Sequence, residues 1–129
     1  MKSILPAVLA AIVLGGLSIL TGCTGGKTTP QYTIETGGDA ARGAQLIGQF
    51  RCGACHLIPG IHDARGMVGP PLIYFGERTF IGGEVPNTPD NLVHWIQSPQ
   101  SIESGTAMPA LGLSDQQARD VAAYLYTLR

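Results

Sequence analysis

Three residues that can carry chemistry stand together in the middle of the chain, Cys52, Cys55 and His56, in the order Cys-Gly-Ala-Cys-His. Two thiols with two residues between them and a histidine directly after the second are typical of a c-type haem attachment site. The spacing suits this chemistry, because one turn of backbone can present both sulfurs to neighbouring vinyl groups while the histidine comes under the iron. The sequence therefore predicts one covalently bound haem c, with His56 as an axial iron ligand.

Other uses of two cysteines at this spacing are a redox pair, half of a zinc site, or chance. A thioredoxin-like redox pair needs a βαβ context, which the chain does not show. A zinc site completed by His56 or His62 needs a fourth ligand at a recognisable spacing. The remaining cysteine, Cys23, lies far upstream. None of these alternatives explains why a histidine directly follows the second cysteine, so haem attachment is favoured.

A haem iron held by one histidine needs a sixth ligand or keeps an open position. The side chains that could serve are Met67, Met108, His62 and His94. His62 follows the proximal histidine too closely to reach the opposite haem face, and Met67 lies in the segment expected to cover the proximal side. His94 lies off the apolar face of its expected helix, as a solvated residue would.

Met108 is the preferred sixth ligand. It lies between Gly105 and Pro109 in a stiff loop rather than on a helix face. A methionine on a helix face would more often be an ordinary core residue, and that remains the alternative for Met108.

Three helices are expected to position these residues. Each begins with a capping residue, Asp39, Thr88 or Ser114, and they cover about residues 39–51, 88–98 and 114–129. Residues 57–89 are rich in glycine and proline but hold interspersed apolar side chains, so this long connection should wrap something apolar. No strand pattern is present, and the sequence therefore predicts an all-α domain of three or more helices around one haem.

The N-terminal residues predict export and a lipid anchor. Lys2 precedes an apolar run that ends in Leu20-Thr-Gly-Cys23, which resembles the bacterial lipobox. The alternative is an uncleaved transmembrane anchor, but the run is broken by Pro6 and is shorter than the about 20 residues that a span needs. We therefore expect a signal peptide over 1–22, lipidation of Cys23, a flexible tether over 23–38 and a haem domain over 39–129.

Residues 39–129 resemble the class I cytochromes c, in particular small bacterial monohaem cytochromes and the cytochrome domains associated with terminal oxidases. The motifs that carry the resemblance occur in the family's order: Cys52–His56, Gly69–Leu72, the helix Asn91–Pro99, Gly105–Pro109 and Ala122–Leu125. The resemblance implies the class I cytochrome c fold.

The resemblance also implies roles for individual residues. Met108 would be the distal ligand, and the carbonyl of Pro70 would accept a hydrogen bond from His56 Nδ1 and so fix the ring. Leu72 would contact the haem on the proximal side and Trp95 on the methionine side. The remaining assignments are Thr106 near a propionate and Gly43 with Tyr124 at the crossing of the terminal helices.

Two positions depart from the family pattern. The usual aromatic residue four positions before the first cysteine is Gly48, while Phe50 lies two before it. The propionate-binding arginine is also displaced, because Glu77 stands at the matching place and Arg78 follows it. Arg78 is accordingly the candidate for the propionate.

These features together predict an electron-transfer protein rather than an enzyme. Histidine and methionine would fill both axial positions, which leaves outer-sphere, one-electron transfer in a respiratory or photosynthetic chain. The rivals are a haem enzyme or gas sensor with an open iron, and a fixed cytochrome subunit of an oxidase complex. The net charge is −1, and the sequence shows no basic patch that would predict nucleic-acid binding. No small-molecule substrate is expected.

The expected partners are redox proteins, such as a quinol-oxidising complex and a terminal oxidase. Through lipidated Cys23, the domain would be held at a membrane and would face the periplasm or the cell exterior.

Overall fold

The structure is a computed structural model, and it describes residues 34–129. The expected signal peptide, Cys23 and most of the expected tether lie outside the described residues. Within residues 34–129, no helix combines the length and the apolar character needed to cross a membrane.

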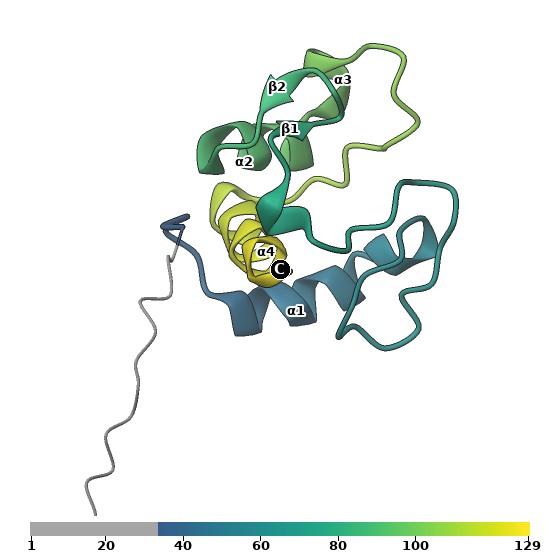
Figure 1. The fold of residues 1–129 in the computed structure, drawn as a ribbon, viewed down its shortest axis with the longest axis vertical. Helices are drawn as coiled ribbons and strands as arrows, with labels where there is room; N and C mark the ends of the chain where they lie inside the picture. Colours follow the sequence, from purple (N-terminus) through teal and green to yellow (C-terminus); the bar gives the residue numbers. More distant parts are fainter. Residues whose placement is uncertain (1–33) are drawn as a thin grey trace, which may run out of the picture. The chain divides into compact units, whose positions relative to one another are not determined.

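The described part of the chain is mostly helical (Figure 1). Its α-helices are α1 (Ala40–Gln49), α2 (Pro89–Gln97), α3 (Pro99–Ile102) and α4 (Asp115–Thr127). Two short 3-10 turns, η1 (Cys52–Ala54) and η2 (Phe75–Glu77), and one small antiparallel ribbon, β1 (Phe80–Ile81) with β2 (Val85–Pro86), complete it. The helical fold confirms the predicted class; the two-residue strands are too short to leave an alternating pattern in the sequence.

The three predicted caps are present. The side chains of Asp39, Thr88 and Ser114 each accept a hydrogen bond from the backbone N–H three residues later. At α4 the Gln117 side chain also accepts the N–H of Ser114, which completes the capping box. Helix α1 ends two residues before the predicted position 51, because Arg51 adopts the left-handed conformation with φ 55°.

Helix α3 differs from the sequence-based expectation. The sequence predicts that the second helix ends at about residue 98, and it indicates no particular helix between there and Ser114. The chain does leave α2 at Ser98, but Pro99 then occupies the first turn of α3. The first N–H groups of a helix have no partner within the helix. Proline therefore fits there, because its lack of an N–H costs no hydrogen bond.

Helices α1 and α4 cross at a glycine. Gly43 is buried, and a Cβ placed on it would lie 2.0 Å from the carbonyl oxygen of Asp120 and 3.0 Å from Cβ of Tyr124. The two backbones can approach this closely only because residue 43 has no side chain. This geometry confirms the predicted pairing of Gly43 and Tyr124 at the crossing.

A buried carboxylate fastens the start of α1 to α4. Asp120 is 3% exposed, and its Oδ1 accepts the backbone N–H of Asp39 over 2.7 Å. The Arg42 guanidinium donates to both carboxylate oxygens, over 2.9 and 3.0 Å. These bonds from Arg42 are the main reason that the pKa of Asp120 is lowered to about 2.

The residues just before α1 also contact α4. Thr36 is buried; its hydroxyl donates to the carbonyl oxygen of Arg119 over 3.2 Å, and the Arg119 side chain donates back to the Thr36 carbonyl over 3.2 Å. Ile34 packs against the core. The packed part of the chain therefore begins before residue 39, the predicted start of the domain.

Candidate functional site

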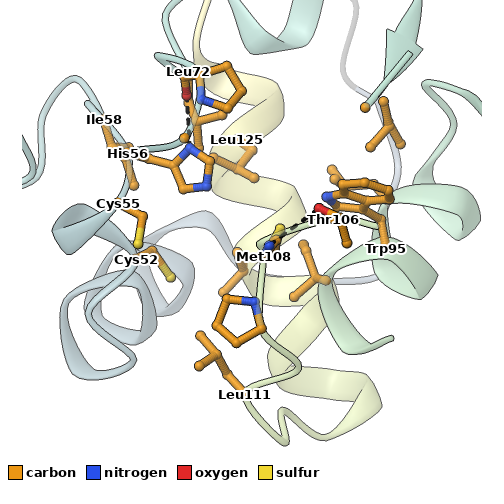
Figure 2. Close-up of a pocket in the computed structure, with 18 of the residues that line it drawn as sticks. Cys52, Cys55, His56, Ile58, Leu72, Trp95, Thr106, Met108, Leu111 and Leu125 are labelled. Carbon is orange, nitrogen blue, oxygen red and sulfur yellow. Dashed lines mark hydrogen bonds between the residues drawn. The ribbon is translucent and has the colours of Figure 1, made fainter. Parts of the chain in front are cut away.

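A largely apolar pocket of about 490 Å³ lies against helices α1, α2 and α4 (Figure 2). The side chains that give it its apolar character include Ile47, Phe50, Ile58, Phe75, Leu92 and Leu125. The volume lies within the range of about 300–1,000 Å³ that is usual for cofactor sites. The pocket is therefore large enough for a cofactor and apolar enough to serve as the centre of the domain's core.

Cys52, Cys55 and His56 all line this pocket. They belong to the tight turn of η1, in which the N–H groups of Cys55 and His56 both donate to the Cys52 carbonyl, over 3.2 and 3.0 Å. Figure 2 shows the two cysteine side chains next to each other on one side of the pocket. Burial raises the pKa of the Cys52 thiol.

A glycine lets this turn pack closely. A Cβ placed on Gly53 would lie 2.5 Å from Cα of Ala64, so the turn rests directly on the following loop. Leu57 and Arg65 form a bridge at the same place, and the Gly66 N–H donates to the Gly53 carbonyl over 3.0 Å. The motif is thereby supported from behind by residues 57–66.

The His56 ring is fixed by one hydrogen bond. Its Nδ1 lies 2.8 Å from the carbonyl oxygen of Pro70. Because a carbonyl oxygen can only accept, Nδ1 carries the hydrogen and Nε2 keeps its lone pair. This is the tautomer that can ligate a metal through Nε2, and the contact with Pro70 is the one that the resemblance implied.

Of the four candidates for a sixth ligand, Met108 alone lines the pocket. Met67 is 93% exposed, and His62 is paired with Asp63 at 2.9 Å on the surface. His94 is also exposed, and its Nε2 lies 2.8 Å from Oγ of Ser101. The structure therefore brings Met108 into the same cavity as Cys52, Cys55 and His56 and leaves the other three outside.

The other predicted contact residues, Leu72, Trp95, Thr106 and Arg78, also line the pocket. Trp95 packs on the ribbon, since a Cβ on Gly82 would lie 2.7 Å from its ring. Arg78 donates to the carbonyl oxygens of Pro71 and Ile73, and its guanidinium carbon lies 5.4 Å from the centre of the Phe75 ring.

Two polar residues behind the pocket were not found from the sequence. The Asn87 amide donates to the carbonyl oxygens of Phe75, over 3.1 Å, and Arg78, over 3.0 Å. The Tyr126 hydroxyl donates to Asn87 Oδ1 over 2.9 Å. Burial raises the pKa of Tyr126 to about 12. Only the fold brings these two residues together, because no local pattern joins positions so far apart.

The loop over residues 57–89 was expected to wrap something apolar, and it does so with only some of its apolar side chains. Ile58, Leu72 and Phe75 face the pocket. Val68 also lines the pocket, whereas Met67 and Tyr74 do not and are 93% and 61% exposed. The loop therefore encloses the pocket with some of its apolar side chains and presents others to solvent.

The donor set fits a covalent haem. Two adjacent thiols, an imidazole of defined tautomer and a thioether open into one apolar pocket, which suits a large apolar ring that carries vinyl groups and an iron. Within residues 34–129, no three or more His, Cys, Asp and Glu side chains gather as a metal site of their own would require. The zinc alternative therefore lacks its ligands in the described part of the chain.

Comparison with known proteins gives the same family. The sequence model described as cytochrome c matches residues 40–129. Over 91 residues the chain is 36% identical to cytochrome c oxidase subunit 2 of Alkalihalophilus pseudofirmus, covering 70% of this chain and 26% of that protein. It is 30% identical over 109 residues to cytochrome c oxidase subunit 2 of Bacillus subtilis, covering 80% of this chain and 30% of that protein.

The matched segment spans between a quarter and a third of the length of these relatives. The likeness therefore concerns one domain of each. Taken with the pocket and its paired thiols, the match over residues 40–129 establishes that the chain belongs to the cytochrome c family and carries haem c bound covalently through Cys52 and Cys55.

Proposed function

We propose that this domain is a one-electron carrier in which His56 and Met108 are the axial ligands of the haem iron. The observation that carries the proposal is that, of the candidate iron ligands, these two share the pocket with Cys52 and Cys55. The bound haem supplies a couple between Fe(II) and Fe(III). With both axial positions taken by side chains, no position is left for a substrate, so electron transfer is outer-sphere.

The surrounding residues hold this arrangement. Pro70 orients His56 through the hydrogen bond to Nδ1. Leu72 and Trp95 supply apolar walls that exclude water, and methionine ligation raises the reduction potential relative to a site with two histidines. Arg78 and Thr106 are the polar groups proposed to face the propionates.

A visible spectrum with a redox titration tests this proposal. The oxidised protein should be low-spin and show the far-red charge-transfer band of a methionine–iron bond. It should take up one electron per chain reversibly. A high-spin spectrum would contradict the proposal and favour the rival, an enzyme or gas sensor with an open iron.

A second candidate is a cytochrome that stays within an oxidase complex. The observation that favours it is the likeness to two proteins named cytochrome c oxidase subunit 2. Solubilising membranes in a mild detergent separates the candidates. Co-purification of the haem domain with an oxidase at constant stoichiometry supports the fixed subunit, while its release as a separate protein supports a carrier between a quinol-oxidising complex and a terminal oxidase.

We further propose that lipidated Cys23 anchors the domain at a membrane, facing the periplasm or cell exterior. The support is the Leu20–Cys23 motif after an apolar run. In cells, Cys23→Ser should abolish lipid labelling and move the cytochrome from the membrane to the soluble fraction. Retention of Cys23→Ser in the membrane would instead favour an uncleaved anchor.

A further inference from the structure

The segment that carries Met108 makes few hydrogen bonds to the helices. Residues 104–112 contain neither helix nor strand. The Thr106 N–H donates to the carbonyl oxygen of Glu103 over 3.1 Å, and the Met108 N–H donates to Oγ1 of Thr106 over 3.3 Å. Both bonds are local. They shape the segment but do not fix its position relative to the rest of the domain.

Gln100 of α3 provides a hydrogen bond between this segment and a helix. Its side-chain Nε2 donates to the carbonyl oxygen of Met108 over 2.5 Å. Within residues 34–129 this is the one hydrogen bond that joins residues 104–112 to a helix. It acts on the backbone of Met108 itself, so it limits how far that residue can move from the pocket.

A second glutamine makes a similar hydrogen bond at the end of the segment. Nε2 of Gln97, in α2, donates to the carbonyl oxygen of Leu113 over 3.2 Å. Leu113 is buried and begins the approach to α4. Gln97 thus makes the same kind of bond as Gln100, but to a residue held in place by the core. The chain offers a matched pair in which only one member touches Met108.

We propose that Gln100 is a positioning residue for the methionine ligand: its hydrogen bond to the Met108 carbonyl keeps the thioether in place against ligands from solution. The inference rests on the proposed ligation by Met108. If the bond is lost, the segment gains freedom, and the equilibrium between bound and displaced methionine shifts toward displacement. An external ligand then competes more easily for the iron.

Imidazole is the probe, added to the oxidised, haem-loaded protein while the far-red methionine band is followed. Gln100→Glu keeps the size of the side chain but removes the donor, and Gln97→Glu makes the same change at the control position. Gln100→Glu should raise the apparent affinity for imidazole about fivefold, the factor that corresponds to about 1 kcal/mol for one hydrogen bond. Gln97→Glu should stay within about twofold of the wild type.

A third variant tests whether the donor itself matters. Gln100→Arg restores N–H groups near the Met108 carbonyl and cannot itself ligate the iron at neutral pH. Its imidazole affinity should return toward the wild-type value. This rescue would not be expected if the side chain only filled space.

The outcomes are distinct. Equal imidazole affinity in Gln100→Glu and the wild type would overturn the inference about Gln100. An equal rise in Gln100→Glu and Gln97→Glu would also overturn it, because the effect would then be general loosening. Absence of the far-red band in the wild type would overturn the ligation by Met108, and this is seen before any variant is made.

Discussion

Gly69 lies so close to His56 that no side chain fits between them: a Cβ placed on Gly69 would lie 2.3 Å from Cε1 and 2.7 Å from Nδ1 of the ring. The Gly69 N–H donates to the Cys55 carbonyl over 2.8 Å, and the next residue, Pro70, accepts the hydrogen bond from His56. Two consecutive residues therefore set both the support and the orientation of the ring. Backbone atoms of Gly69 and Pro70 thus limit and orient the His56 ring.

Gly69→Ala should displace the His56 ring, because the added methyl group would overlap it. We expect a smaller low-spin fraction in the oxidised protein, measured by visible and electron paramagnetic resonance spectra. Gly48→Ala is the control, since a Cβ there meets no atom within 4 Å and Gly48 does not line the pocket. It should keep the wild-type spectrum. A wild-type spectrum for Gly69→Ala would show that Gly69 does not limit the ring.

Met108→Ala should remove the far-red band and lower the reduction potential, because the thioether that favours Fe(II) is lost. His94→Ala is the comparison: the His94 ring bonds to Ser101 and does not line the pocket. It should keep both the band and the potential of the wild type. A spectrum of Met108→Ala unchanged from the wild type would instead move the sixth ligand to His94.

The local signals in the sequence were the dependable ones. The caps Asp39, Thr88 and Ser114 were predicted correctly, because a cap depends on the residues within one turn of it. The proposed haem contacts came from spacing and from resemblance. The structure brings these residues into one pocket, and their roles toward the haem stay predictions.

The unpredicted features depend on residues far apart in the chain. The bond of Tyr126 to Asn87 and the burial of Asp120 arise only once α4 is packed against the rest of the domain. Helix α3 was missed because Pro99 can either end one helix or begin the next, and the choice depends on the chain's direction after Ser98. Exposure of Met67 was missed because the composition of a loop does not say which of its apolar residues face inward.

The crossing of α1 and α4 can be tested with two glycines of one helix. Gly43→Ala should lower the free energy of unfolding by about 3 kcal/mol, since its methyl group would overlap the Asp120 carbonyl. Gly48→Ala should raise it by up to about 1 kcal/mol, since a Cβ at Gly48 meets no atom within 4 Å and alanine favours the helix. Urea unfolding of the haem-loaded variants measures both. Changes of equal sign would contradict the crossing.

Asp120 should make the stability of the domain sensitive to acid. Its pKa is lowered to about 2 from the ordinary value of 3.8, chiefly by the hydrogen bonds from Arg42. A carboxyl group with a lowered folded-state pKa stabilises the fold above its unfolded-state pKa, and that contribution is lost as the pH falls through the folded-state pKa. The loss is therefore expected between about pH 4 and pH 2.

Asp120→Asn isolates this contribution. At pH 6 the variant should be less stable than the wild type by about 2 kcal/mol, because the charge-assisted bonds to Arg42 are weakened. The difference should shrink as the wild-type carboxylate is protonated toward pH 2. Asp63→Asn makes the same change at a side chain that is 81% exposed and should leave the unfolding free energy nearly unchanged. A difference between Asp120→Asn and wild type that stays constant from pH 6 to pH 2 would mean that the Asp120 carboxylate is not the titrating group.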